Sequence, residues 1–156
     1  MTTVDRLISA PRDAVASVLA DPRTYDGVVV GGKRIRWFDA RWPEPGTRFH
    51  HSIGVALLHI RDDTEVVADE LPDRLHLAAG LGPLGTAEVI FRLDDDGGGT
   101  RVTMTEHPTA GPLKLVWSPP LAAVMAGRNR VALRRLEELA VARAAVRRRA
   151  AAGLPA

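Results

Sequence analysis

Two adjacent histidines, His50 and His51, stand in the segment RFHHSIG (residues 48–54), which alternates like a β-strand. An imidazole can bind a metal ion or exchange a proton near neutral pH. Successive side chains of a regular strand point to opposite faces, so the two rings cannot share a metal unless a bulge intervenes. The other histidines lack metal-ligand spacing and the chain has no cysteine, so we predict no metal site and no thiol nucleophile.

The alternation assigns the two histidines to different environments. His51 shares a face with Phe49 and Ile53, whereas His50 lies with Ser52 on the other face. An inward His51 is a candidate acid/base for an enolising carbonyl, which is the chemistry that cyclisation or dehydration of a polyketide requires. A histidine on an apolar strand face is also commonly a hydrogen-bonded core or pocket-wall residue, so both interpretations stay open.

Two further polar residues are predicted to point inward. Glu106 shares a strand face with Met104, and Asn129 lies on the apolar face of the final helix. Burial without a partner costs about 1–3 kcal/mol for a neutral group and more for a charge. We therefore expect Glu106 either to pair with Arg128 or bond Asn129 as a structural link, or to meet the polar end of a ligand in a partly wet pocket. In the second case Glu106 is a candidate catalytic residue beside His51.

The elements that position these residues follow from hydrophobic periodicity. Residues 3–10 predict a strand, and residues 11–22 predict a helix. The segment RTYDGVVVGG (residues 23–32) predicts a short second helix before its paired glycines. Between Lys33 and Glu106, short alternating runs separated by turn signals such as LPDR and DDDGGGT predict six antiparallel strands. From Pro119 onward, apolar residues recur every three or four positions and predict one long amphipathic helix. The prediction is an α+β fold: a curved, seven-stranded antiparallel sheet around a long C-terminal helix, with two short helices after the first strand.

The same alternation sorts the residues that face the space between sheet and helix. A cavity there takes its walls from the inner strand residues and the apolar helix face, with Trp117 at its rim. A core filled by the same side chains is the alternative. The predicted lining is Trp37, Phe49, His51, Leu77, Val89, Phe91, Met104, Glu106, Trp117, Met125, Asn129 and Leu133.

The composition is that of one globular domain, with 156 residues of which 46% are hydrophobic and 26% charged. We assign residues 1–146 to that domain and residues 147–156 to a basic tail that frays. Residues 114–156 hold nine Lys or Arg and two Glu. This basic block lies on one helix without interleaved aromatic residues, so we predict no nucleic-acid binding. No signal peptide or membrane span is recognisable, and the absence of cysteine fits a cytoplasmic protein.

Several phrases of the sequence, in their order, resemble the START-like superfamily (SRPBCC) and in particular its polyketide cyclase/dehydrase and lipid-transport group. The phrases are ISAPRDAVASVLADPRTY, RWPEPGTRFHHSIG, GGTRVTMTEHP and GRNRVALRRLEEL, and the resemblance spans residues 3–142. It implies a helix-grip fold, in which the curved sheet wraps the long helix and leaves an apolar cavity between them. Many members carry a tryptophan near the position of Val28, and this chain does not.

The resemblance implies several functions, because START-like domains bind lipids and hormones, cyclise polyketides or act as co-chaperones. Our first hypothesis is binding of a small hydrophobic ligand in the cavity. The alternative is a polyketide cyclase, aromatase or dehydratase with His51 as acid/base, and the third is a protein-interaction module. Whether the chain is an enzyme stays open, as does the choice between monomer and homodimer. We predict no cofactor, because the glycine-rich DDDGGGT precedes a strand rather than a phosphate-binding helix.

Overall fold

The computed structural model describes residues 1–28, 32–55 and 58–153, and within these ranges all side chains except those of residues 32–34, 51–55 and 58–62. Its elements, in chain order, are β1 (Thr2–Ile8), α1 (Arg12–Leu19), the 3₁₀ turn η1 (Pro22–Thr24), α2 (Tyr25–Val28), β2 (Gly32–Phe38), β3 (Arg48–Val55), β4 (Leu58–Glu70), β5 (Arg74–Gly80), the 3₁₀ turn η2 (Gly82–Leu84), β6 (Thr86–Asp96), β7 (Gly99–Ala110), α3 (Pro112–Leu115) and α4 (Pro119–Ala151).

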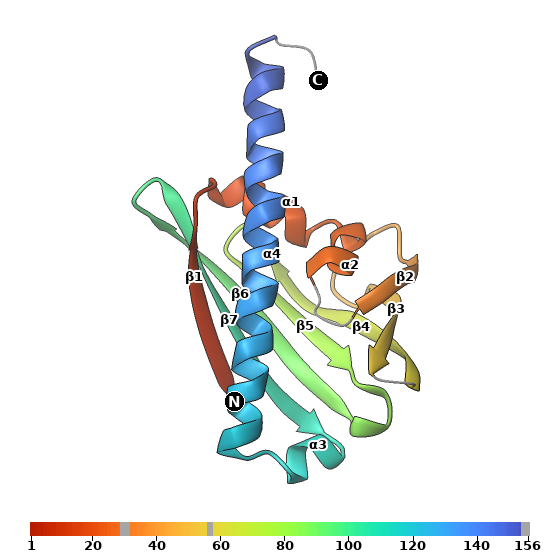
Figure 1. Cartoon of the computed structure of the whole chain (residues 1–156). Coiled ribbons are helices and arrows are strands. Elements are labelled where there is room, and N and C mark those ends of the chain that lie inside the picture. The colour runs from red at the N-terminus through yellow and green to blue at the C-terminus, as the bar shows by residue number, and fades with distance from the viewer. Residues whose placement is uncertain (29–31, 56–57, 154–156) are drawn as a thin grey trace.

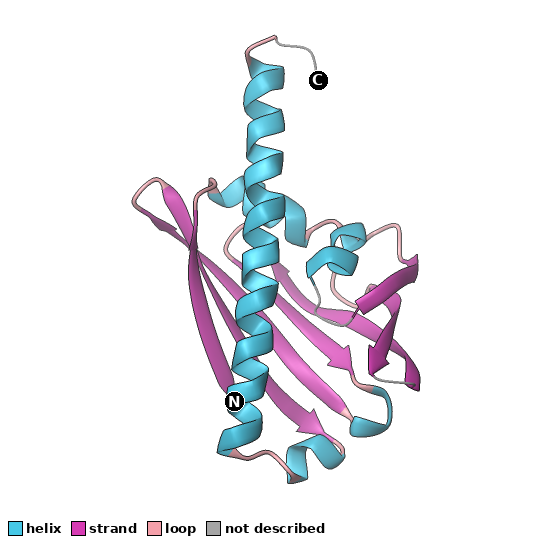
Figure 2. Ribbon diagram, in the orientation of Figure 1, coloured by secondary structure: helices cyan, strands magenta, loops and turns pink. Residues whose placement is uncertain are grey.

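The seven strands form one antiparallel sheet in the order β1-β7-β6-β5-β4-β3-β2. Strands β2 to β7 follow one another as a meander, and β1 completes the sheet by pairing with β7. Figure 1 and Figure 2 show α4 lying across one face of the twisted, curved sheet. The predicted fold class is therefore confirmed, with α3 as an additional short helix that the sequence did not predict.

The core lies between the inner face of the sheet and one stripe of α4. Alternate residues of the central strands are buried, for example Leu75 and Leu77 on β5 and Phe91 and Leu93 on β6. Full burial of a side chain of this size contributes about 1.5–3 kcal/mol, so this packing holds α4 on the sheet. The buried residues of α4 recur every three or four positions, as an amphipathic helix requires; they are Asn129, Ala132, Leu133, Leu136, Ala140 and Ala144.

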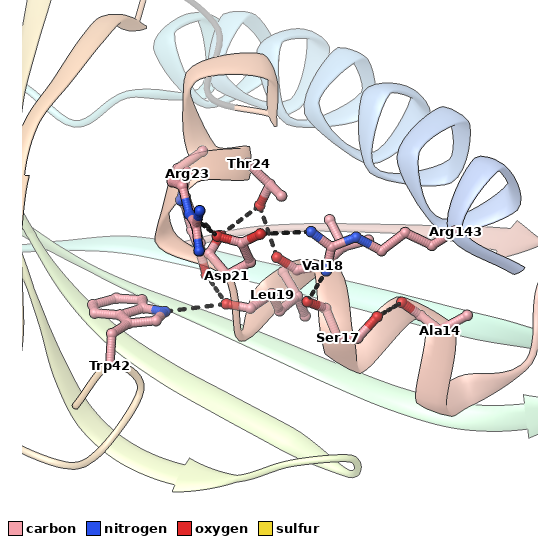
Figure 3. A network of polar contacts seen from close by, with 10 residues as sticks. Ala14, Ser17, Val18, Leu19, Asp21, Arg23, Thr24, Trp42 and Arg143 are labelled. Carbon is pink, nitrogen blue, oxygen red and sulfur yellow. Dashed lines mark hydrogen bonds and ion pairs between the residues drawn. The ribbon is translucent and has the colours of Figure 1, made fainter. Parts of the chain in front are cut away.

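Polar contacts fasten α1 to the C-terminal half of α4 (Figure 3). The Arg143 guanidinium donates to the carbonyl oxygen of Ser17 and, at 2.7 Å, to the carboxylate of Asp21. The carbonyl oxygen of Leu19 accepts from the indole nitrogen of Trp42 at 3.3 Å. The end of α1 thus joins α4 to the loop between β2 and β3.

The C-terminal turns of α4 extend beyond the sheet (Figure 1). The helix continues to Ala151, past residue 146 where we placed the end of the domain. The last buried residue is Ala144, and residues 146–151 are exposed. A boundary at residue 146 therefore rests on burial rather than on the end of the helix, and it stays a prediction. No helix in the described part of the chain is long and apolar enough to cross a membrane.

Candidate functional site

A partly open cavity lies between the inner face of the sheet, α2 and α4. The space that it offers to the centres of water molecules is about 80 Å³. Tyr25 and Phe49 are almost completely buried, whereas Leu81 and Arg128 are partly exposed, so the mouth is at the end of β5 beside α4. The lining consists of Tyr25, Val28, Phe49, Thr64, Leu77, Ala79, Gly80, Leu81, Val89, Phe91, Met104, Glu106, Arg128, Asn129 and Ala132.

The main polar group in this lining is a cluster of three side chains, Glu106 from β7 and Arg128 and Asn129 from α4. The Nη2 atom of Arg128 donates to both carboxylate oxygens of Glu106 at 2.7 Å. The Nδ2 atom of Asn129 donates to Oε2 of Glu106 at 2.7 Å, and its Oδ1 atom accepts from Nε of Arg128 at 3.2 Å. Both contacts that the sequence predicted for Glu106 are present, and they link the sheet to the helix.

The cluster compensates a buried charge. Glu106 is 2% exposed and Asn129 is 0% exposed. Three short hydrogen bonds, two of them from a guanidinium, offset the cost of removing the carboxylate from water. The Nη1 atom of Arg128 has no hydrogen-bond partner among the described residues, and the side chain is 30% exposed. The cluster therefore offers an unused N–H group of a neutralised ion pair at the mouth of the cavity.

An aromatic group closes the deep end of the cavity. The ring centroids of Tyr25, Trp42 and Phe49 lie 4.8 to 5.7 Å apart. The Tyr25 hydroxyl donates to the carbonyl oxygen of Leu19 at 3.0 Å. Burial, with a smaller contribution from the charge of Asp69, raises the pKa of Tyr25. This hydroxyl is therefore neutral and already bonded, and the deep end acts as an apolar wall.

The structure brings part of the predicted lining together on the cavity wall. Leu133 is instead fully buried in the core at 1% exposure, and Met125 and Trp117 are partly exposed side chains that do not line the cavity. Strand alternation and helix periodicity identify inward residues but not which of them border empty space. The predicted residues that line the cavity are Phe49, Leu77, Val89, Phe91, Met104, Glu106 and Asn129.

The structure places Trp37 away from the cavity. Its side chain is 54% exposed, and its ring centroid lies 5.3 Å from that of His50. The register of β2 against β3 shifts between Ile35 and Trp37, so that Ile35 pairs with His51 but Trp37 pairs with His50. This bulge reverses the alternation after Ile35, and no glycine or proline at that point of the sequence indicates it.

His51 lies in β3, where its backbone pairs with Ile35 and Asp62. Its side chain lies outside the described residues, so its role as an acid/base stays a prediction. On the same strand, Phe49 lines the cavity and His50 is exposed. Among the side chains that are described, no group of three histidine, aspartate or glutamate residues is arranged to hold a metal ion.

The residues that the predicted lining lacked lie mainly at the two ends of the cavity. Gly80 is the last residue of β5 and Leu81 lies just beyond it, where alternation no longer predicts direction. Ala79 and Ala132 have the spacing of inward residues, and their small size is the signal that could have indicated room beside them. The missing residues are Tyr25, Val28, Thr64, Ala79, Gly80, Leu81, Arg128 and Ala132.

No protein-family model and no curated protein matches the chain. Solved structures do match it. The di-domain ARO/CYC StfQ from the steffimycin biosynthetic pathway superimposes with a TM-score of 0.71 at 13% identity, over 92% of this chain and 51% of that chain. Ara h 8.0201 has a TM-score of 0.70 at 9% identity, over 90% of this chain and 96% of that chain. The chain has a START-like, helix-grip fold.

A protein of Thermus thermophilus shares this START-like fold, with a TM-score of 0.64 at 21% identity over 90% of this chain and 97% of that chain. At such identities the likeness concerns the path of the backbone. In the present START-like chain, the cavity lies between the sheet and the long helix, where the resemblance implied it. What such a cavity can bind depends on its own side chains, which here include the cluster of Glu106, Arg128 and Asn129.

Proposed function

We propose that the chain binds a small, mostly apolar molecule in this cavity and places a hydrogen-bond acceptor of that molecule at Arg128. The observation that carries the proposal is an apolar cavity under α4 in which one neutralised cluster supplies most of the polar lining. Apolar walls favour burial of a ligand, and a few polar groups orient it. The donor is the Nη1 atom of Arg128, since the Nη2 and Nε atoms already donate to Glu106 and Asn129.

The volume sets the size of the ligand. Pockets that enclose a drug-sized molecule have volumes of about 300–1,000 Å³, whereas this cavity has about 80 Å³. It fits a short chain or a single ring, or the end of a longer molecule that leaves through the mouth. A polyketide long enough to cyclise exceeds this volume. The cyclase hypothesis therefore requires a wider cavity in addition to an inward His51.

The charges favour a neutral ligand. Glu106 already neutralises Arg128, so a carboxylate in the cavity would lose its hydration without gaining a cation of its own. A ketone can accept a hydrogen bond from Nη1 without that cost. We expect a methyl ketone to bind about fivefold more tightly than the alkane or the fatty acid of the same length.

The test is a pair of leucine substitutions on α4. Ala132 lines the cavity and is 6% exposed, whereas Ala123 is exposed and lies outside the lining. Methyl ketones of increasing length are titrated and followed by the methyl NMR signal of Met104. The wild type and Ala123→Leu should bind alike, and Ala132→Leu should bind at least about tenfold more weakly because its side chain fills the space.

Unfolding in urea shows whether Ala132→Leu weakens binding by filling the cavity or by destabilising the fold. A leucine that fills a cavity leaves the free energy of unfolding unchanged or raises it, whereas overpacking lowers it by about 1–3 kcal/mol. Binding by a stable Ala132→Leu variant with wild-type affinity would show that the ligand lies elsewhere.

A further inference from the structure

One end of the molecule exposes a group of aliphatic side chains, which we call the apolar tip: Leu84, Leu115, Val116 and Val124. Leu115 is 86% exposed, Val124 68%, Val116 61% and Leu84 45%. They come from η2, α3, the link after α3 and the first turns of α4. In Figure 1, α3 and the start of α4 lie at the end of the molecule opposite the projecting C-terminal turns of α4.

The apolar tip is supported by a close backbone contact. Gly85 and Gly111 both have positive φ, 112° and 82°. A Cβ atom on Gly85 would lie 2.0 Å from the carbonyl oxygen of Ala110, and one on Gly111 would lie 2.5 Å from the Cα atom of Gly85. The hydroxyl oxygens of Thr86 and Thr109 lie 2.9 Å apart beside this contact. The turns that carry Leu84 and Leu115 are therefore held together, and their exposure belongs to the folded structure.

The segments that carry the apolar tip hold no acidic residue. Residues 80–87 contain no charged residue, and residues 107–136 contain five Lys or Arg and no Asp or Glu. Lys114 directly precedes Leu115, and Trp117 follows Val116 with a partly exposed ring. Aliphatic side chains flanked by a cation and an indole are suited to the boundary between lipid headgroups and acyl chains.

We infer that the apolar tip docks on a phospholipid bilayer that carries anionic lipids. Leu115 and Val116 enter the headgroup region, and Lys114 meets the lipid phosphates. A second copy of the chain is the less favourable occupant, because two facing tips would bring their Lys114 side chains together with no carboxylate between them.

The cavity adjoins the proposed docking surface. Leu81 lines the cavity and directly precedes η2, and Arg128 lines it one helical turn after Val124. An apolar ligand dissolved in the bilayer would therefore meet the mouth without crossing bulk water. This consequence rests on the proposed ligand binding, whereas docking itself does not.

The test is sedimentation of the full chain with vesicles. Vesicles of equal parts phosphatidylcholine and phosphatidylglycerol should bind the wild type, and vesicles of phosphatidylcholine alone should bind it several-fold more weakly. Added salt should weaken binding to the anionic vesicles. The double variant Leu115→Ser/Val116→Ser should lower the partition coefficient at least about tenfold, and Lys114→Ala about fivefold.

A matched pair of valines provides the control. Val124 and Val146 are 68% and 65% exposed and lie toward opposite ends of α4. Val124→Ser should lower the partition coefficient about fivefold, and Val146→Ser should leave it unchanged. Both positions are on the surface, so neither substitution disturbs the core.

Three outcomes would overturn the inference. The first is no binding to anionic vesicles. The second is binding that survives the tip substitutions but is lost in Arg148→Glu/Arg149→Glu, which would assign it to the basic end of α4. The third is a concentration-dependent dimer that the tip substitutions abolish. The cavity-filled Ala132→Leu variant should still dock, so failure of docking and failure of ligand binding are distinguished.

Discussion

Asp21 shows how a single carboxylate holds two elements together, η1 and α4. It accepts a hydrogen bond from the backbone amide of Arg23 at 3.1 Å at the start of η1, and from Arg143 of α4 at 2.7 Å. Burial alone would raise the pKa of Asp21, but the hydrogen bonds and charges of Arg143 and Arg23 outweigh it and lower that pKa below 3.8. The folded state therefore favours the charged form of Asp21 more than the unfolded state does.

This lowered pKa predicts a pH-dependent contribution to stability. Because the pKa of Asp21 is lower in the folded state, its contribution is fully present above the ordinary pKa and is lost as the pH falls through the folded value. Asp21→Asn keeps an oxygen for the Arg23 amide but removes the charge. It should lower the free energy of unfolding by about 1–2 kcal/mol at neutral pH, and the difference from the wild type should shrink below pH 3.8.

Urea unfolding at neutral and acidic pH measures both effects. Asp13→Asn is the control, because Asp13 of α1 also pairs with an arginine of α4, Arg147, but its side chain is 67% exposed. An exposed ion pair contributes about 0–1 kcal/mol. Equal losses in the two variants would contradict the role assigned to Asp21.

Individual residues of the site were predictable where a simple rule applies to them. Glu106 and Asn129 stand at inward positions of a regular strand and a regular helix, so the sequence showed that they need partners. Trp37 follows a bulge in β2 that no residue of the sequence indicates, so its side chain does not point inward as predicted. Leu81 lies beyond the end of β5, where neither rule applies.

At the scale of elements, the packing of η2 against the start of α3 depends on the absence of a side chain at Gly85. Gly85→Ala should be severely destabilising, by about 3 kcal/mol or more, because the Cβ atom would meet the backbone oxygen of Ala110 at 2.0 Å and the φ of 112° disfavours an L-residue. Gly98 is the matched control, since its φ is 88° and nothing lies within 4 Å of a Cβ atom there. Gly98→Ala should cost about 1 kcal/mol.

Denaturant unfolding distinguishes the steric cost from the conformational one. A Gly85→Ala variant no less stable than Gly98→Ala would mean that η2 moves away from α3 at little cost. The apolar tip would then lack the rigidity on which its exposure depends.

The long elements were predictable because their patterns repeat. The six strands of the meander show alternation bounded by glycine and proline, and α4 shows a stripe over many turns. The short elements α3 and η2 have four and three residues, which is too few to display any period. These two elements form much of the apolar tip, so periodicity could not locate the proposed docking surface.

At the scale of the molecule, α4 has different tasks along its length. Near its start, Arg128 and Ala132 border the cavity, and farther along Leu136 and Ala140 fill the core. Beyond the core, Arg143 donates to the Ser17 carbonyl and the Asp21 carboxylate at the end of α1, a contact that we call the clasp. Because the helix is anchored by the core and the clasp, the sheet need not close tightly on its first turns. This division explains how the fold holds its helix firmly and still leaves space at one end.

The same division predicts where the chain can be shortened. A chain that ends at residue 146 loses the pair of Arg147 and Asp13, whose side chains are 51% and 67% exposed, and little else. Its free energy of unfolding should fall by less than about 1 kcal/mol. A chain that ends at residue 142 also loses the clasp of Arg143 and the burial of Ala144, which is 3% exposed.

The shorter chain should lose about 2–4 kcal/mol, because the Asp21 carboxylate and the Ser17 carbonyl lose their partner and buried apolar surface is lost with Ala144. Urea unfolding of both chains beside the wild type measures the difference. If the two shortened chains lost similar free energies of unfolding, the boundary of the domain would lie before residue 142. Ligand binding per folded molecule should be unchanged in both, since the cavity lining on α4 ends at Ala132. The clasp thus stabilises the fold from outside the site, and its loss should act on stability without altering the cavity.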